Sequence, residues 1–210
     1  MTSKMIGDVE IFVDDAEKYL QINDIDAPDL RRVWGFLDDE EFGGYERFLC
    51  FHNTDPPADV LEEVGAVLVD DNLEMRLTPE NFVPASVTNV HRLADEDFGA
   101  FANLHDKLNP DMYWNGERIA KDLTRWAIFA VQRCGGIVAY AMLALWNREI
   151  YKVEAESADQ YADLITTVAK HAFSDGALEV LYTVDKADPY AEVAEAVGFA
   201  VTGFYKGYKT

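Results

Sequence analysis

Cysteine is scarce in this sequence of 210 residues, which contains only Cys50 and Cys134. Two cysteines cannot form the disulfide framework of a small secreted domain, and they lack the C-x-x-C spacing of redox or zinc sites. The first residues, MTSKMIGDVE, contain no apolar core of a secretory signal, and no apolar run approaches the roughly 20 residues that span a membrane. We therefore expect a cytoplasmic protein with two buried free thiols and no membrane contact.

Histidine is also rare, and the spacing of the four histidines argues against a metal centre. No two are four residues apart and no H-E-x-x-H motif occurs, so we expect no metal. A G-x-S-x-G motif, which would present a nucleophilic serine, is absent as well. The pairs Gly43-Gly44 and Gly135-Gly136 are typical of turns rather than of a dinucleotide-binding loop.

Positive charge is sparse: 18 lysine and arginine residues stand against 39 aspartate and glutamate residues, for a net charge of −21. Without a basic stripe, nucleic acid is not an expected partner. A negative field attracts cationic substrates such as amines, although acidity spread along the chain equally serves solubility or reflects an acidic proteome. Hydrophobic residues make up 49% of the chain, which is ample for a folded core.

Two ungapped segments resemble each other: DPPADVLEEVG at 55–65 and DPYAEVAEAVG at 188–198. Each lies between strand-like runs, and we read each as part of a strand, helix and hairpin unit. The aspartate is the expected helix N-cap, the proline the first helical residue and the glycine the left-handed helix end. The pattern predicts a duplicated half-domain; the alternative is a coincidence of common helix-start and helix-end residues. The identical pairs are Asp55/Asp188, Pro56/Pro189, Ala58/Ala191, Val60/Val193, Glu62/Glu195, Val64/Val197 and Gly65/Gly198.

Strands and helices alternate along the rest of the chain. The first half has a strand at VEIFV and a helix at 28–37 before the repeated segment. The second half predicts a strand at 87–93, helices at 95–108 and 117–124, a hairpin over 126–146, a strand at 149–156, a helix at 158–173, a strand at 179–184, a helix at 189–197 and two closing strands. This order predicts an α/β fold with a mixed central sheet flanked by helices. We expect a smaller α/β half-domain at 1–77, a linker at 78–86 and a complete domain at 87–210.

The order of elements over 87–210 resembles that of the Gcn5-related N-acetyltransferase (GNAT) superfamily. The resemblance depends on the hairpin at Gly135-Gly136, on the strand EIYKVEA before the helix at 158–173, and on the ending AEAVGFAVTGFYKGY. Within that ending, Gly198-Phe199 matches the family's G-F element. Tandem members with one degenerate copy, such as mycothiol synthase and the Fem-type transferases, look similar. The resemblance implies an acyl-CoA N-acyltransferase fold at 87–210 and a partial copy at 1–77.

The chemistry that the resemblance implies is transfer of an acetyl group from acetyl-CoA to an amine. In the family, one strand splays from its neighbour to bind the pantetheine arm, and the next helix presents its N-terminus to the diphosphate. This stretch lacks the glycines and arginine of the usual phosphate loop, and it carries carboxylates instead. The positions expected to bind acetyl-CoA are Lys152, Val153, Glu154, Ala155, Ser157, Ala158, Asp159, Gln160 and Tyr161.

The resemblance also indicates acid, base and acceptor groups. Ala194 occupies the position of the family's usual tyrosine acid. The expected replacement is Tyr190, one turn away, or Tyr205 or Tyr208 on the last strand. Glu154 is the expected general base because it lies on the strand beside the thioester, with Glu156 and His105 as weaker candidates. The loop between the first two helices of the second half is expected to hold the acceptor or to cover the core edge, through Met112, Tyr113 and Trp114.

Two functions follow from these patterns. The first is an N-acetyltransferase that acts on a small amine by direct attack, without a metal. The second is a catalytically degenerate acyl-CoA sensor or interaction module, which the acidic loop without glycine favours. A third function is that of a related transferase with another acyl or aminoacyl donor. The sequence leaves open whether the protein forms a homodimer.

Overall fold

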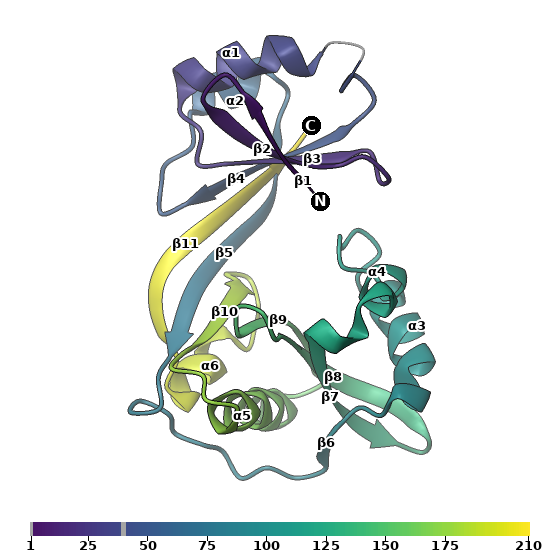
Figure 1. Ribbon diagram of the computed structural model, residues 1–210. Helices are drawn as coiled ribbons and strands as arrows, with labels where there is room; N and C mark the ends of the chain where they lie inside the picture. The colour runs from purple at the N-terminus through teal and green to yellow at the C-terminus, as the bar shows by residue number, and fades with distance from the viewer. Residues whose placement is uncertain (1, 39–40) are drawn as a thin grey trace. The chain divides into compact units, whose positions relative to one another are not determined.

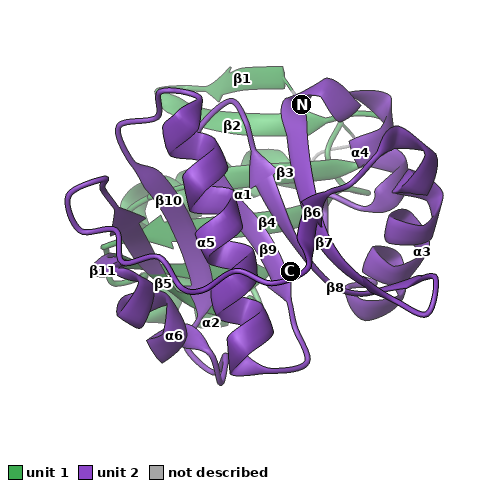
Figure 2. Ribbon diagram, turned by 90° about the horizontal axis from the view of Figure 1, so that it is seen from below, with its two compact units in different colours: residues 1–73, 203–210 green, residues 74–202 purple. Residues whose placement is uncertain are grey.

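The computed structural model describes residues 2–38 and 41–210 and divides into two compact units. Unit 1 contains residues 1–73 and 203–210, and unit 2 contains residues 74–202 (Figure 2). The predicted boundaries at 77 and 87 follow the sequence repeat, whereas compactness groups residues 203–210 with the start of the chain. In the described part of the chain, no helix is long and apolar enough to cross a membrane.

Unit 1 contains one part of a mixed sheet, and its helices lie on one face of that part (Figure 1). The strand order is β1-β2-β3-β4-β11-β5, in which β3 and β4 are parallel and β11 is antiparallel to β4. The parallel pair stays in register from Tyr19↔Glu46 to Asn23↔Cys50. The elements are β1 (Thr2–Ile6), β2 (Val9–Asp14), β3 (Tyr19–Asn23), α1 (Ala27–Leu37), β4 (Glu46–His52), α2 (Ala58–Glu63), the first part of β5 (Val67–Leu77) and the last part of β11 (Ala200–Lys209).

Helix α1 begins and packs as the sequence predicts. Asp26 is its N-cap and accepts a hydrogen bond from the backbone N–H of Asp29 at 2.9 Å. The buried helix stripe packs on one face of the sheet, because alternate strand residues point to that face. The members of this core include Ile11, Leu20, Ile22, Leu30, Val33, Leu37, Leu49 and Phe51.

Unit 2 contains the other part of the same mixed sheet, in the order β5-β10-β9-β8-β7-β6. Only the neighbours β9 and β10 have a parallel register among the strand pairs described for this unit. Its elements are the last part of β5, β6 (Val90–Arg92), a 3₁₀ turn at Asp95–Asp97, α3 (Phe98–Leu108), α4 (Gly116–Lys121), a 3₁₀ turn at Leu123–Arg125, β7 (Trp126–Arg133), β8 (Gly136–Ala144), β9 (Glu149–Glu154), α5 (Ala158–Ser174), β10 (Val180–Asp185), α6 (Ala191–Val197) and the start of β11.

Helices cover both faces of the sheet in unit 2 (Figure 1). On one face, Phe101 of α3 packs in a cluster with Tyr140 and Met142 of β8. On the opposite face, Phe129 of β7 meets His171 of α5 with ring centroids 5.2 Å apart. The α/β fold with a mixed sheet that the sequence predicts is thus confirmed.

The predicted linker at 78–86 forms no helix or strand, and its end is fixed to α5. Ala85 N donates to Thr166 Oγ1 at 3.1 Å, and Thr88 donates from its backbone N and its Oγ1 to Asp163 Oδ2, both at 3.1 Å. Thr166 and Asp163 are both buried, so these bonds satisfy polar groups that water cannot reach.

The two predicted hairpins at the ends of the repeat units are wrong. Residues 67–77 and 200–209 are the single long strands β5 and β11. Each strand runs from one unit into the other, so its two ends lie beside different strands; β11, for example, pairs with β4 over Tyr205–Lys209. Strands β1 and β3 were also missed, and β1 is mostly exposed, so it shows no alternation of apolar residues.

The predicted helix starts of the repeat need correction as well. Helix α2 begins at Ala58, and Asp55 is not its N-cap. The reason is the second proline, Pro57, because a residue before proline is pushed out of the helical region and Pro56 cannot begin the helix. Helix α6 begins at Ala191, after a turn in which Asp188 accepts from Tyr190 N at 2.7 Å.

The expected left-handed glycines are confirmed, with φ of +68° at Gly65 and +107° at Gly198. The turn between β7 and β8 lies one residue earlier than predicted. Arg133 pairs with Gly136, so Cys134 and Gly135 form the loop, with φ of +51° and +80°. Because it lies in this loop, Cys134 is exposed, and the expected burial is correct for Cys50 alone of the two thiols. Two consecutive positive φ values are typical of the type I′ turn that suits a two-residue hairpin.

Candidate active site

The parallel strands β9 and β10 separate toward their C-terminal ends. Their register covers two residue pairs, of which Tyr182↔Ile150 is the second. Both strands continue past that pair, β9 to Glu154 and β10 to Asp185. A V-shaped opening between parallel strands exposes main-chain groups of the strand edges, which are strong hydrogen-bonding partners for an extended ligand.

A β-bulge lies where the separation begins. In the ladder between β8 and β9, Leu143 faces Ile150 while Met142 faces Lys152, so Tyr151 is an extra residue on β9. A bulge bends its strand and increases the local twist. We attribute the divergence of β9 from β10 to this bulge, because the parallel register ends at the residue just before it.

The opening is a cleft of about 330 Å³. This volume is at the small end of ligand pockets. The cleft brings together six residues that the sequence predicted for acetyl-CoA or catalysis: Lys152, Val153, Glu154, Ala155, Tyr161 and Tyr190. The remaining lining residues, which the sequence analysis did not select, are Asp185, Ala187, Asp188 and Pro189.

The charge of the cleft is predominantly negative. Lys152 Nζ lies 3.2 Å from Glu154 Oε1, and this partly exposed pair joins the predicted base to the nearest cation of the cleft. Asp185 Oδ1 accepts from Ala187 N at 2.7 Å, so its carboxylate holds the turn after β10. Asp188 has the same role toward Tyr190 N. Both carboxylates thus shape the loop while adding negative charge to the cleft wall.

Tyrosine rings surround the inner part of the cleft. The hydroxyls of Tyr161 and Tyr182 are in direct hydrogen-bond contact, and the rings of Tyr161 and Tyr190 lie 5.4 Å apart. Burial raises the pKa of Tyr161 and that of Tyr182 above the usual tyrosine value. Both phenols therefore keep their protons near neutral pH, and in their mutual hydrogen bond one donates and the other accepts.

The start of α5 uses its own side chains to satisfy its free amides. Ser157 Oγ accepts from Gln160 N at 3.3 Å, as the predicted cap requires. Gln160 is buried, and its Oε1 accepts from Glu156 N at 2.9 Å instead of from Ser157 N. Ser157, Ala158 and Asp159 are exposed. Gln160 and these three exposed residues were predicted to bind the cofactor, but none of the four lines the cleft.

The predicted acceptor residues lie in an aromatic cluster at the edge of the core. The ring centroid of Trp114 is 5.4 Å from that of Trp126 and 6.0 Å from that of Trp146. Tyr113 packs edge-on against Trp114 at 5.2 Å. Met112 is half-buried beside them in sequence. The structure places none of the three in the cleft lining.

His105 is fully buried, and its ring is held on both sides. Its Nε2 lies 2.9 Å from the carbonyl oxygen of Trp114, which can only accept, so Nε2 carries the proton. Its Nδ1 then accepts from the Tyr140 hydroxyl at 2.7 Å, and that oxygen accepts from Asn109 Nδ2 at 3.0 Å. Burial lowers the pKa of His105, which favours this neutral form. These contacts give His105 a structural position between α3, β8 and the loop.

Tyr205 lies in unit 1, in a different environment from the other predicted catalytic residues. Its hydroxyl is 3.3 Å from Cys50 Sγ, and its ring centroid is 5.1 Å from that of His52. The corresponding parallel strands of unit 1, β3 and β4, show no separation like that of β9 and β10. Among the described residues, no group of three or more His, Cys, Asp or Glu side chains could hold a metal ion.

The site residues that sequence reasoning missed have weak local signals. Tyr151 is the bulge residue, and a bulge depends on how β8 pairs with β9 rather than on a motif. Tyr182 lies in a run that reads only as a buried strand. Asp185 and Asp188 could have been found, because a carboxylate-rich turn after a parallel strand lies at the edge where such sheets bind ligands.

The parallel pair that splays at a bulge, with α5 on one face and α3 and α4 on the other, defines the class of fold. It is the fold of the GCN5-related N-acetyltransferases, with the same sheet continued by the strands of unit 1. No protein-family description and no curated protein is similar enough to the sequence to match.

Solved structures match over nearly the whole chain. A conserved protein of unknown function from Staphylococcus epidermidis has a TM-score of 0.73 at 8% identity, and the match covers 100% of this chain and 93% of that one. A GCN5-related N-acetyltransferase from Kribbella flavida has a TM-score of 0.69 at 15% identity, covering 99% and 88%. A tandem GNAT protein from the clavulanic acid biosynthesis pathway has a TM-score of 0.60 at 11% identity, covering 96% and 78%. These likenesses establish the fold; the duplication of a half-domain stays a prediction.

Proposed function

We propose that this chain is an N-acetyltransferase that moves an acetyl group from acetyl-CoA to a small amine in the cleft of unit 2. The observation that carries the proposal is the separation of β9 from β10 at the Tyr151 bulge. It turns the edge of β9 from Lys152 to Ala155 into a wall of the cleft. A pantetheine arm is extended and contains two amides, so it matches a strand edge in length and in hydrogen-bonding pattern.

The proposed reaction is direct attack of the amine nitrogen on the acetyl carbonyl carbon. A C–N bond forms as the C–S bond breaks, and backbone N–H groups of β9 stabilise the negative charge that develops on the carbonyl oxygen. The amine proton goes to the carboxylate of Glu154, which lies in the cleft wall. The departing thiolate takes a proton from a cleft phenol, in the first instance Tyr190.

A second candidate function is an acyl-CoA sensor or interaction module without turnover. The specific observation in its favour is the chemistry of the expected diphosphate end. The Glu154, Asp185 and Asp188 carboxylates stand in the cleft wall against one lysine of the same wall, Lys152. At the start of α5, the amide of Gln160 is already occupied by the Ser157 cap. The residues present thus suit the pantetheine arm better than the phosphates, since like charges at short range repel.

Thermal unfolding with acetyl-CoA tests the proposal. At about 1 mM ligand, a dissociation constant near 10 μM would stabilise the folded state by about 2.7 kcal/mol and raise Tm by several degrees. ATP is the control for a nucleotide without a pantetheine arm. A shift that acetyl-CoA causes and ATP does not, followed by release of CoA on addition of an amine, is the expected result. A shift without turnover under an amine screen supports the sensor, and the absence of any shift removes the enzyme and the sensor and leaves the interaction module.

A further inference from the structure

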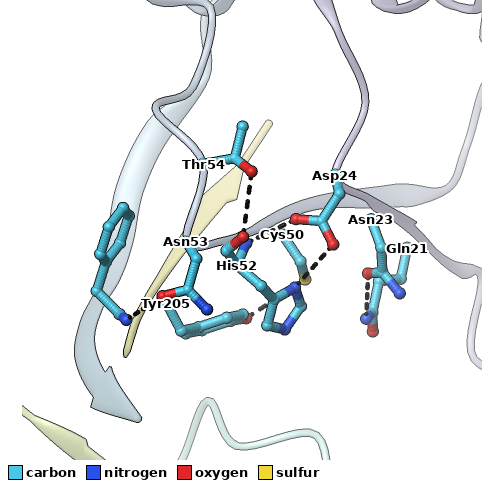
Figure 3. Close-up of polar contacts among 9 residues, drawn as sticks. Gln21, Asn23, Asp24, Cys50, His52, Asn53, Thr54 and Tyr205 are labelled. Atoms are coloured by element: carbon cyan, nitrogen blue, oxygen red, sulfur yellow. Dashed lines mark hydrogen bonds and ion pairs between the residues drawn. The ribbon is translucent and has the colours of Figure 1, made fainter. Parts of the chain in front are cut away.

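A histidine and an aspartate form an oriented pair at the end of the parallel strands of unit 1 (Figure 3). Asp24 Oδ1 accepts from the backbone N–H of His52 at 2.6 Å, and Asp24 Oδ2 lies 3.2 Å from His52 Nδ1. A carboxylate can only accept, so Nδ1 carries the ring proton. The other ring nitrogen, Nε2, is then a free acceptor on a side chain that is 39% exposed.

The aromatic ring of Tyr205 borders this pair. Its centroid lies 5.1 Å from that of His52, and the two planes are inclined by 48°. The Tyr205 hydroxyl points back to Cys50 Sγ at 3.3 Å, as Figure 3 shows. Burial raises the pKa of the Cys50 thiol to about 12, so this contact joins two neutral groups and adds no charge. The hydroxyl is thereby occupied, and the ring remains as the surface beside His52.

These side chains share the face of the sheet that lies opposite the α1 core. Tyr205 is directly opposite His52, and Gly207 is opposite Cys50 in the antiparallel ladder. Asn23 is level with Cys50 in the parallel ladder. Asp70 of β5 is the further charged group on this face, since one of its oxygens would lie 2.8 Å from a Cβ built on Gly207. Both charged groups named on this face, Asp24 and Asp70, are carboxylates.

We propose that Asp24, His52 and Tyr205 form a binding site on unit 1 for an alkyl amine. The ammonium group donates a hydrogen bond to His52 Nε2, the negative charge of Asp24 favours the cation, and the Tyr205 ring packs against the alkyl chain. An imidazole, a carboxylate and an aromatic ring thus all favour the same class of ligand, an alkyl amine.

In its choice of ligand class the inference rests on the proposed function, but the binding site is argued from unit 1 alone.

The test uses the full chain, no acetyl-CoA, and 1,4-diaminobutane as the probe. Histidine ring resonances are followed by NMR during the titration, with the His52 signals assigned by their loss in His52→Gln. We expect the His52 signals to shift with saturation at a dissociation constant of about 1 mM or below, and butane-1,4-diol to cause no shift. Calorimetry then measures binding to the variants. His52→Gln and Asp24→Asn should each weaken binding by about tenfold or more, which corresponds to roughly 1.4 kcal/mol.

Asp24→Asn is a conservative test, because Asp24 has a φ of +48° and asparagine tolerates this left-handed conformation. The matched control is Asp8→Asn, which removes the same charge from unit 1 at an exposed ion pair with Arg32 of α1. Binding should be unchanged in that control. Equal weakening in Asp8→Asn and Asp24→Asn, or His52 signals that do not move with the diamine, would overturn the proposal. Because acetyl-CoA is absent, diamine binding without an acetyl-CoA shift would leave this site standing and remove only the proposed function.

Discussion

Glu154 is the side chain on which the proposed chemistry depends most directly. It lines the cleft and pairs with Lys152 Nζ at 3.2 Å, so its carboxylate is held near the strand edge rather than turned to solvent. We predict that Glu154→Gln lowers kcat with acetyl-CoA and an amine by about 10²-fold or more, the usual effect of losing a general base. Acetyl-CoA binding, measured by thermal shift, should persist.

Glu156 provides the matched control for that change. It lies two residues further on, is exposed, and pairs with Arg133 at 3.4 Å. An exposed pair of this kind contributes little to stability. Glu156→Gln should therefore leave both kcat and Tm close to the wild-type values. Equal losses of turnover in the two variants would show that charge near the cleft, and not the position of Glu154, is what matters.

His105 predicts a pH dependence of stability. Burial lowers its pKa below the ordinary value of 6.5, so the unfolded chain binds the proton more readily than the folded chain. The contribution of neutral His105 to the free energy of unfolding is therefore fully present above pH 6.5. It is lost as the pH falls from 6.5 toward the lowered pKa of the folded state. In His105→Gln, urea unfolding should show a loss of about 1–3 kcal/mol near neutral pH, since a buried hydrogen bond is broken.

The variant should also lose less stability than the wild type between pH 6.5 and the point where carboxylates begin to titrate. Parallel curves of unfolding free energy against pH for the two proteins would contradict the assignment of this dependence to His105.

The ends of helices α2 and α6 look alike in sequence but differ in their surroundings. Gly65 and Gly198 both have positive φ, yet a Cβ on Gly65 would meet nothing within 4 Å, whereas a Cβ on Gly198 would lie 2.0 Å from Asn81 O. We predict a cost of about 1–2 kcal/mol for Gly65→Ala, from the left-handed backbone alone. Gly198→Ala should cost more than about 4 kcal/mol, because a backbone atom must move.

Urea unfolding of the two alanine variants checks this difference. The close approach at Gly198 is fixed by the segment at 78–86, since Val83 N donates to Val197 O at 2.9 Å. Similar losses in the two variants would mean that this segment gives way easily, and that its contact with the end of α6 contributes little.

The composition of the chain predicts a response to salt. A net charge of −21 destabilises a compact state through self-repulsion, and salt screens that repulsion. We expect Tm to rise as KCl increases from about 0.1 M to about 1 M, where the Debye length falls from about 10 Å to about 3 Å. Acetyl-CoA binding should strengthen over the same range, because the cleft wall and the phosphates carry the same sign.

Thermal unfolding at several KCl concentrations, with and without acetyl-CoA, measures both effects. Sodium sulfate is not a suitable replacement, since it also strengthens burial of apolar surface. Weaker acetyl-CoA binding at high salt would indicate that cations dominate the binding site, contrary to the charges on the cleft wall.

Much of the fold follows from local sequence. The cap at Asp26, the apolar stripe of α1 and the turn glycines predict their elements because each acts over a few residues. The strand before α5 and the G-F element after α6 indicate the fold class and place Glu154 and Tyr190 close together. Asp55 shows the limit of prediction from local sequence. It was predicted to cap helix α2, but the second proline delays the start of the helix.

Pairing between distant strands could not be predicted in this way. The hairpins predicted at 67–77 and 200–209 are continuous strands because their two ends belong to different units. The Tyr151 bulge exists only through the ladder with β8, and the cleft exists only through that bulge. The pairing of Asp24 with His52 likewise depends on the parallel register of β3 and β4. Local sequence determined the caps, turns and most helices of this protein. Long-range strand pairing determined its longest strands and its sites, because register depends on partners that no short segment contains.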